Sequence, residues 1–192
     1  MHPSTPAPHP STPALKEWAA VVHALLAGRQ TVLLRKGGIG EKRFTLDAES
    51  FLLFPTTAHS HAESTRPEHH DLLTAGENDC RGGHVVIRAR LDVVEAIEVR
   101  RPEAVAELEP FHVFTTASVV ANRIDFRPRR ALAVLVVRAR PVLEPVVLTR
   151  EERFGGCVSW VDLPVGEAIA GPAAVDDEEL HRVGRTVRQA VG

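Results

Sequence analysis

Two adjacent basic residues, Arg35 and Lys36, stand where an apolar run ends and a glycine-rich stretch begins. Glycines let backbone N–H groups approach an anion, while guanidinium and ammonium groups supply charge and hydrogen-bond donors. The run Gly37 to Gly40 lacks the Lys-Ser/Thr ending of a nucleotide-binding P-loop, and a plain hairpin turn fits it as well. We therefore expect either a simple turn, or an element in which Arg35 and Lys36 bind a phosphate or a base edge.

A second basic feature is a five-residue pattern that occurs twice. Residues 86–90 have the sequence VIRAR and residues 136–140 have the sequence VVRAR. Side chains alternate in a strand, so the two arginines of each copy share a face. If the two strands are neighbours, four guanidiniums line one sheet face. This row is either a solvated face that pairs with carboxylates, or an anion-binding surface that includes Arg88 and Arg138.

Histidine and cysteine side chains in residues 56–81 could ligate a metal, since imidazole and thiolate are good zinc ligands. Their spacing matches no metal motif, so we predict no metal site and no cofactor. Cys157 lies in the stretch Gly155 to Trp160, without a neighbouring base that would make it a nucleophile. We expect this stretch to be a packed strand, with Trp160 in the core or on a binding surface, and we predict no catalytic residue.

Composition limits the class of protein. The chain has 192 residues, of which 44% are hydrophobic, so one core of ordinary size is expected. A net charge of -2 excludes an overall basic field, and any contact with nucleic acid must be local. Two cysteines suit a reducing compartment, and the sequence has neither a membrane-spanning run nor a secretory signal. We expect a cytoplasmic protein without membrane contact.

Hydrophobic periodicity predicts helices and strands after a proline-rich start. Residues 1–13 repeat Pro-Ser-Thr-Pro-Ala and are expected to be a disordered tail. A single α+β domain is expected at 14–164, followed by a C-terminal helical tail at 165–192. The expected elements are a helix at 15–26, strands at 30–35 and 44–54, a long polar loop at 56–81, a strand at 84–99, a mainly helical stretch at 105–126, a strand or strand pair at 132–148, and a helix after 176.

Several short segments together resemble a bacterial family known as domain of unknown function 1802. The segments are residues 14–19 (ALKEWA), 33–39 (LLRKGGI), 51–56 (FLLFPT), 110–112 (PFH), 135–138 (LVVR) and 155–160 (GGCVSW). The resemblance covers the chain from Ala14 to about Leu163. The occasional company of this family with restriction-endonuclease-like domains implies a role in recognising nucleic acid.

The start of the folded part is also similar to ASCH and related PUA-like barrels, whose pattern is Gly-x-Lys-x-x-Glu-x-Arg. Gly28 and Arg35 match this pattern, while Gln30 and Leu33 replace its Lys and Glu. The similarity implies a strongly bent mixed sheet or a partly closed PUA-like β-barrel, flanked by helices. The two replacements argue against an enzymatic role for the motif.

These observations favour a non-catalytic nucleic-acid-binding or base-sensing module, associated with restriction or defence systems, whose partner is DNA or RNA. The alternative is a small metal-dependent hydrolase or nuclease that uses His59, His112 and Cys157. In the binding hypothesis, the two histidines are polar pocket residues. The expected binding residues are Arg35, Lys36, His59, Arg88, His112, Arg138 and Trp160.

Overall fold

Six strands form one mixed sheet in the computed structural model, which describes residues 11–36, 46–58, 60–156 and 158–192. The strand order is β2-β5-β4-β3-β1-β6. The pair β1–β3 is parallel, and the other four neighbouring pairs are antiparallel. The strands are β1 (Thr12–Trp18), β2 (Val32–Lys36), β3 (Ser50–Thr56), β4 (His84–Glu98), β5 (Leu132–Thr149) and β6 (Trp160–Leu163).

At the central strands β1 and β3 the sheet separates two hydrophobic clusters, because side chains alternate along a strand. On β1, Ala14 belongs to the smaller cluster and Leu15 to the larger one, and on β3 the same is true of Leu52 and Leu53. Both faces of these central strands are therefore buried. Such strands show continuous apolar runs rather than an apolar–polar alternation.

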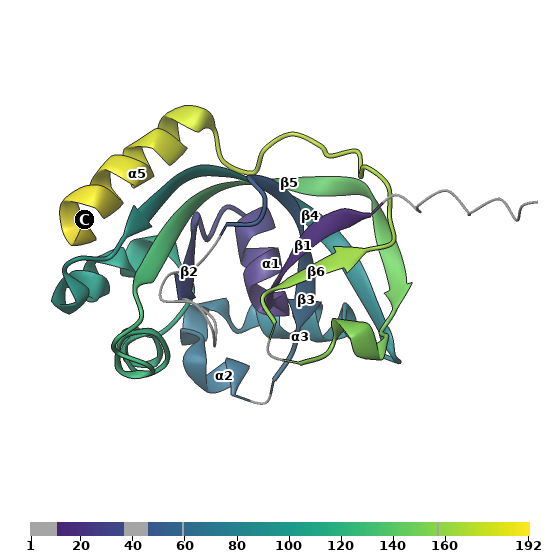
Figure 1. Ribbon diagram of the computed structural model, residues 1–192, viewed down its shortest axis with the longest axis horizontal. Coiled ribbons are helices and arrows are strands. Elements are labelled where there is room, and N and C mark those ends of the chain that lie inside the picture. The colour runs from purple at the N-terminus through teal and green to yellow at the C-terminus, as the bar shows by residue number, and fades with distance from the viewer. Residues whose placement is uncertain (1–10, 37–45, 59, 157) are drawn as a thin grey trace, which may run out of the picture.

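The two longest strands, β4 and β5, carry the bend of the sheet. Their pairing has register shifts between Ile87 and Ala89 and between Val93 and Glu95, and bulges of this kind increase twist and bending. Figure 1 shows both strands arching over α1 (Ala19–Leu26). Within the described residues the edge strands β2 and β6 do not pair with each other, so the sheet is strongly bent but not closed. The expected α+β class with a bent mixed sheet is confirmed.

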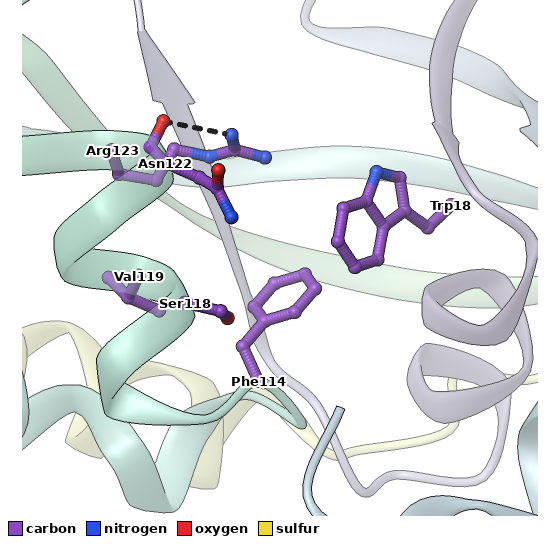
Figure 2. Close-up of a pocket in the computed structure, with 6 residues that line it drawn as sticks. All are labelled: Trp18, Phe114, Ser118, Val119, Asn122 and Arg123. Atoms are coloured by element: carbon purple, nitrogen blue, oxygen red, sulfur yellow. Dashed lines mark hydrogen bonds between the residues drawn. The ribbon is translucent and has the colours of Figure 1, made fainter. Parts of the chain in front are cut away.

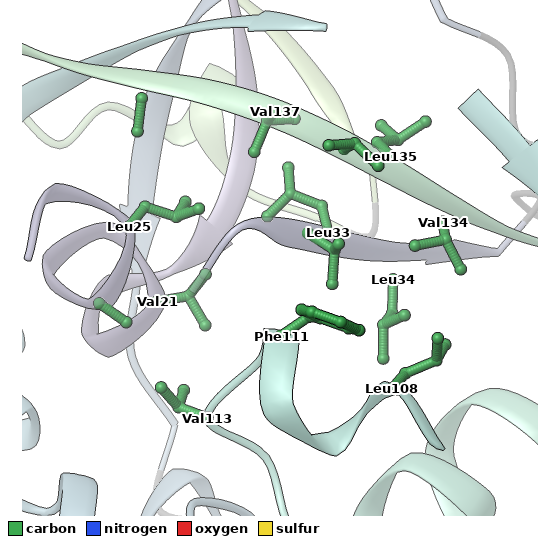
Figure 3. Packing of buried hydrophobic residues seen from close by; sticks show 14 of the residues in the cluster. Val21, Leu25, Leu33, Leu34, Leu108, Phe111, Val113, Val134, Leu135 and Val137 are labelled. Carbon is green, nitrogen blue, oxygen red and sulfur yellow. The ribbon is translucent and has the colours of Figure 1, made fainter. Parts of the chain in front are cut away.

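Helix α1 lies in the hollow of the bend and is buried along most of its length. Figure 3 shows Val21 and Leu25 of this helix pointing toward Leu33 of β2 and Val137 of β5. All four side chains are almost completely shielded from solvent. The helix therefore lies at the centre of the larger cluster. Its burial also fixes the position of Trp18, which directly precedes its first turn.

Helix α5 (Asp177–Val191) packs against β4 and β5 from the other side. Its N-cap residue Asp176 accepts a hydrogen bond from the backbone N–H of Glu179 at 2.8 Å, and the acidic first turn suits the helix dipole. Leu180, Val183 and Val187 are buried in the larger cluster. The segment that we expected to be a tail therefore ends in a helix that belongs to the core.

The start of the folded part differs from the expectation in two ways. Thr12 and Pro13, which we expected in the disordered tail, pair with Leu163 and Asp162 in β1 and β6. The helix expected at 15–26 begins only at Ala19, because residues 12–18 form β1. A strand that is buried on both faces has no period of two, so its apolar residues imitated the first turn of a helix.

The chain between β3 and β4 is helical where a long loop was expected at 56–81. It contains α2 (His61–Ser64), the 3-10 helix η1 (Pro67–His69) and α3 (Asp71–Asn78). Only Leu72 and Gly76 are buried in α3, so its apolar face is too sparse to produce a clear helical period. This correction is relevant to function, because α2 supplies a side chain to the candidate site.

The mainly helical stretch expected at 105–126 is confirmed, although it consists of short, different helices. These are the 3-10 helix η2 (Pro102–Phe111), α4 (Thr116–Val119) and the π-helix η3 (Val120–Asp125). Pro110 lacks a backbone N–H and prevents a continuous α-helix here. The strands expected at 84–99 and 132–148 are also confirmed. Within the described residues, every helix is too short or too polar to traverse a lipid bilayer.

The packing of α5 predicts that this helix contributes to the stability of the whole domain. Leu180→Ala removes a buried side chain and should lower the free energy of unfolding by about 2–4 kcal/mol. Arg185→Ala, on the exposed face of the same helix, should change it by less than about 0.5 kcal/mol. Urea denaturation followed by circular dichroism measures both values, and equal small effects would show that α5 is a dispensable tail.

Candidate functional site

Trp18 is the junction between β1 and α1, and two aromatic rings hold its indole. His61 of α2 stacks on it with ring centroids 3.7 Å apart and an interplanar angle of 15°. Phe114 meets it edge-on at 5.2 Å. The indole is half-buried and thus still reaches the surface.

Beside this aromatic group lies a groove formed by two adjoining pockets. The first is lined by six residues, as Figure 2 shows: Trp18, Phe114, Ser118, Val119, Asn122 and Arg123. The second encloses about 510 Å³ of space, including space open to solvent, and is lined by Leu34, Arg35, Lys36, Asn122, Arg123, Phe126 and Arg127. Both pockets are lined by Asn122 and Arg123, so they adjoin each other, and we call the two together the basic groove.

Glu17 connects the two ends of this surface. Its carboxylate accepts a hydrogen bond from the backbone N–H of Trp18 at 2.8 Å and forms an ion pair with Arg35 at 3.2 Å. Both partners of the ion pair are well shielded, with 5% of the Glu17 side chain and 12% of the Arg35 side chain exposed. Arg35 also donates to the carbonyl of Lys16 at 3.2 Å. The guanidinium is therefore held rigidly at the bottom of the groove.

Arg123 brings a second guanidinium to the same place. Its Nε donates to the carbonyl of Leu34 at 3.2 Å. Burial lowers the pKa of Arg123 and so does the neighbouring Arg35, while the Glu17 carboxylate raises it. Two guanidiniums thus share one carboxylate in a poorly hydrated location, which leaves an excess of positive charge.

Lys36 fixes the helix that supplies the wall of the groove. Its Nζ donates to the carbonyls of Arg123, Ile124 and Phe126, at 2.6, 3.1 and 2.5 Å. These carbonyls lie at the C-terminal end of the π-helix η3, where a cation is favourable. Burial lowers the pKa of Lys36, as does Arg123, whereas Asp125 raises it. Lys36 therefore adds positive charge to the groove and uses its hydrogen-bond donors to hold η3.

The rim of the groove is formed by an exposed aromatic residue and an arginine. Phe126 is 56% exposed, and the guanidinium of Arg127 lies 4.8 Å from its ring centroid. Among the described residues other than glycine, only Arg127 has a positive φ, of 53°. Backbone strain and π-helical turns both concentrate at functional sites.

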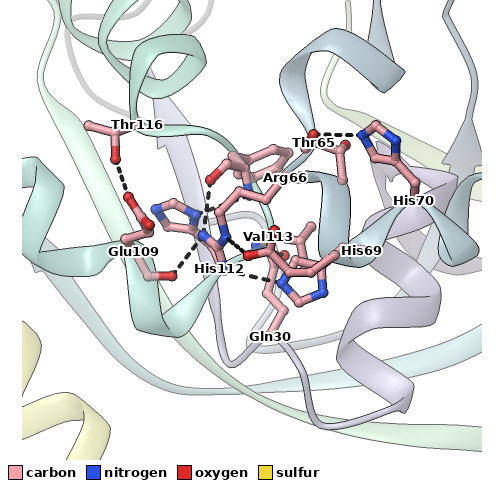
Figure 4. A network of polar contacts seen from close by, with 11 residues as sticks. Gln30, Thr65, Arg66, His69, His70, Glu109, His112, Val113 and Thr116 are labelled. Carbon is pink, nitrogen blue, oxygen red and sulfur yellow. Dashed lines mark hydrogen bonds and ion pairs between the residues drawn. The ribbon is translucent and has the colours of Figure 1, made fainter.

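His112 does not line the groove, but it contacts Phe114, which does. It is 1% exposed, and its Nδ1 accepts a hydrogen bond from the backbone N–H of Phe114 at 3.2 Å. Figure 4 shows the network around it, in which Arg66 donates to the carbonyl of Phe114 at 3.1 Å and Gln30 accepts from Val113. Burial lowers the pKa of His112 to about 4. The imidazole is therefore neutral and positions Phe114.

The two copies of the arginine pattern do lie on neighbouring strands, and Arg90 is directly opposite Arg140. Arginines of this row form ion pairs with neighbouring carboxylates. Arg88 is held by the buried Asp79 at 2.7 Å, while Arg138 pairs with Asp177 of α5 at 2.7 Å. Neither Arg88 nor Arg138 lines the basic groove.

The family of the protein follows from comparison with known sequences. The profile of the family described as Domain of unknown function (DUF1802) matches residues 14–186, which is most of the chain. The chain belongs to the DUF1802 family. This confirms the expected membership, and the match extends beyond the expected end near Leu163, through most of α5. No curated protein matches the chain significantly.

Two solved structures are similar to the DUF1802 chain, and both are mutants of ZmASCH from Zymomonas mobilis. The crystal structure of a serine-to-alanine mutant has 9% sequence identity and a TM-score of 0.45, with 93% of this chain and 98% of that chain covered. The crystal structure of a tyrosine-to-phenylalanine mutant has 10% identity and a TM-score of 0.43, with 90% and 96% covered.

Of the remaining predicted site residues of the DUF1802 domain, Trp160 does not line the groove. Trp160 of β6 packs edge-on against Phe51 at 4.9 Å, next to the larger cluster. His59, Cys157 and the glycine run after Lys36 lie outside the described residues. Among the side chains that the structure does describe, no three His, Cys, Asp or Glu residues are grouped so that they could hold a metal ion.

Sequence reasoning missed most of the groove wall. Phe114, Asn122, Arg123 and Arg127 were not among the expected binding residues, and neither was Trp18. One local signal could have identified the rim, namely the concentrated basic run Arg-Pro-Arg-Arg at 127–130. Nothing local connects Trp18 with residues more than a hundred positions further along the chain.

The buried histidines predict a loss of stability in mild acid. Burial lowers the pKa of His61 and His112 to about 4, so the unfolded chain, with an imidazole pKa near 6.5, takes up protons first. The contribution of each neutral histidine to the free energy of unfolding is complete above about pH 6.5 and is lost as the pH falls toward 4. At pH 5 the loss is about 1–2 kcal/mol per histidine. His61→Phe keeps the stack on Trp18 and should show a smaller loss between pH 7 and pH 5 in urea denaturation. An identical pH dependence of both proteins would contradict this prediction.

The Glu17–Arg35 ion pair predicts strong coupling between these residues. Arg35→Met removes the ion-pair partner of the buried Glu17 carboxylate, which keeps only the Trp18 N–H and the charge of Arg123, and should cost up to about 3–5 kcal/mol. The double variant with Glu17→Gln should recover part of this loss. A double-mutant cycle of unfolding free energies should give a coupling of about 1–3 kcal/mol. Additive effects of the two substitutions would refute the coupling.

Proposed function

We propose that this domain is a non-catalytic cytoplasmic module that binds DNA or RNA in the basic groove. The observation that carries this proposal is the continuity of an aromatic pocket at Trp18 and Phe114 with a groove that holds four cationic side chains. Single-stranded nucleic acids are bound by this combination, in which bases stack on aromatic rings and phosphates follow positive charge. The role in restriction or defence systems that the family resemblance implies is part of this proposal.

The groove residues have two different roles, which depend on whether their side chains are held by protein acceptors or exposed at the rim. Arg35, Arg123 and Lys36 are tied to protein acceptors, so they supply a fixed positive potential rather than mobile contacts. Arg127 and Phe126 are exposed at the rim and offer a guanidinium and a ring face to an incoming strand. The overall charge of -2 is compatible with this local arrangement, because binding depends on the charge near the groove.

Binding to single strands should be sensitive to salt and to the rim residues. With about three phosphate contacts, affinity for a labelled strand of about 12 nucleotides should fall roughly twentyfold between about 50 and 200 mM salt. Arg127→Ala should weaken binding about three- to fivefold and flatten the salt dependence, because one cation is removed. Fluorescence anisotropy measures both effects.

Arg138→Ala is the matched control, since it removes one surface guanidinium from the arginine row and leaves the groove intact. If Arg138→Ala weakened binding as much as Arg127→Ala does, the arginine row on the sheet, and not the groove, would be the binding surface. No binding of DNA or RNA at low salt would disprove the proposed function. In the Trp160→Phe background Trp18 is the only indole, so quenching of its fluorescence reports directly on the groove.

A further inference from the structure

A separate cavity lies on the other side of the Trp18–His61 stack. It encloses about 900 Å³ of space, including the part open to solvent, between the first turn of α1, α2 and α3. Its apolar lining consists mainly of small side chains, while His61, Thr57 and Glu77 are the polar groups that line it. The cavity is therefore adjacent to the basic groove and separated from it by the stacked rings.

His61 is a buried polar side chain whose ring nitrogens form no hydrogen bond with the described residues. Its side chain lines the cavity, and 7% of the residue is exposed. One face of the ring is covered by the indole of Trp18, and neither ring nitrogen has a hydrogen-bond partner among the described residues. A largely buried imidazole that faces a cavity takes its hydrogen-bond partner from whatever fills the cavity, and a ligand that displaces water there must provide that partner.

The first turn of α1 also borders the cavity. Ala19 and Ala20 line it, and the N-cap residue Trp18 provides no side-chain cap for the helix. The first N–H groups of a helix have no acceptor within the helix. Gly76 of α3 permits the close approach of the two helices, because a Cβ at this position would lie 2.8 Å from the nitrogen of Ala20.

The polar groups of the cavity favour a neutral ligand over a phosphate. The carboxylate of Glu77 repels an anion, and the low pKa of His61, caused by burial, keeps the imidazole uncharged. Glu77 accepts hydrogen bonds only, whereas the imidazole N–H of His61 donates one. A matching ligand is flat, has an amino group for Glu77 and carries a ring acceptor beside it. This is the Watson–Crick edge of cytosine or adenine.

We propose that this cavity binds one base of the strand held in the basic groove and selects a base that carries an exocyclic amino group. The inference rests on the proposed function. Uracil has a carbonyl where cytosine has its amino group, so uracil would direct an oxygen toward the Glu77 carboxylate. Rejection of the wrong base arises from this unpaired, repelling contact.

Two labelled strands that differ only in the selected edge test the inference. Oligo(dC) and oligo(dU) of equal length have the same phosphates and pyrimidine rings, so the basic groove treats them alike. We expect the protein to bind oligo(dC) about five- to twentyfold more tightly, in line with one charged hydrogen bond. Glu77→Met should abolish this preference, and Ala62→Leu, which fills the cavity, should reduce it in the same way.

Glu63→Met is the matched control, because Glu63 is an exposed acid of α2 that does not line the cavity. This variant should keep the preference for oligo(dC). Equal affinity for the two strands in the unchanged protein, or a preference that survives Glu77→Met, overturns the base pocket and leaves strand binding by the groove standing.

If neither strand binds, the proposed function fails and the cavity is tested alone. Free cytidine and uridine are then titrated while the imidazole signals of His61 are followed by NMR, with His61→Phe identifying them. A shift with cytidine only, absent in Glu77→Met, supports the pocket. No shift, or equal shifts with the two nucleosides, overturns it.

Discussion

The buried contact between Glu17 and Arg35 is the constraint on which the surface of this protein depends. The two residues lie on β1 and β2, which are separated in the sheet by β5, β4 and β3. An ion pair of 3.2 Å between them is possible only because the sheet bends back upon itself. A carboxylate removed from water needs partners, and it obtains them from Arg35 and from the backbone N–H of Trp18. The same contact thus stabilises the bend and positions the indole.

Several side chains of the groove have structural tasks that also determine its chemistry. Lys36 satisfies three carbonyls at the end of η3, and this holds the π-helix whose residues form the groove wall. His112 and Arg66 do the same for Phe114. Positive charge and aromatic rings therefore reach the surface in fixed orientations, so that little conformational entropy is lost when a ligand binds.

Arginine shows how strongly the surroundings decide the role of one residue type. Arg88 and Arg138 lie on the sheet, where neighbouring aspartates neutralise them. Arg35 and Arg123 share a single carboxylate, and Arg127 contacts an aromatic ring. An excess of positive charge therefore arises at the groove, where four cationic side chains line one pocket.

The sequence by itself determined the α+β class, the long strands β4 and β5, the terminal helix and the family, because these depend on local periodicity and on recognisable segments. The first strand and the helices α2 and α3 were not predictable, since burial on both faces of β1 and a sparse apolar face in α3 obscure the local period. Arg35 and Lys36 could be named as basic residues beside a strand. Only the bend of the sheet, a non-local property, brought them to Trp18 and η3 and created the groove and the neighbouring cavity.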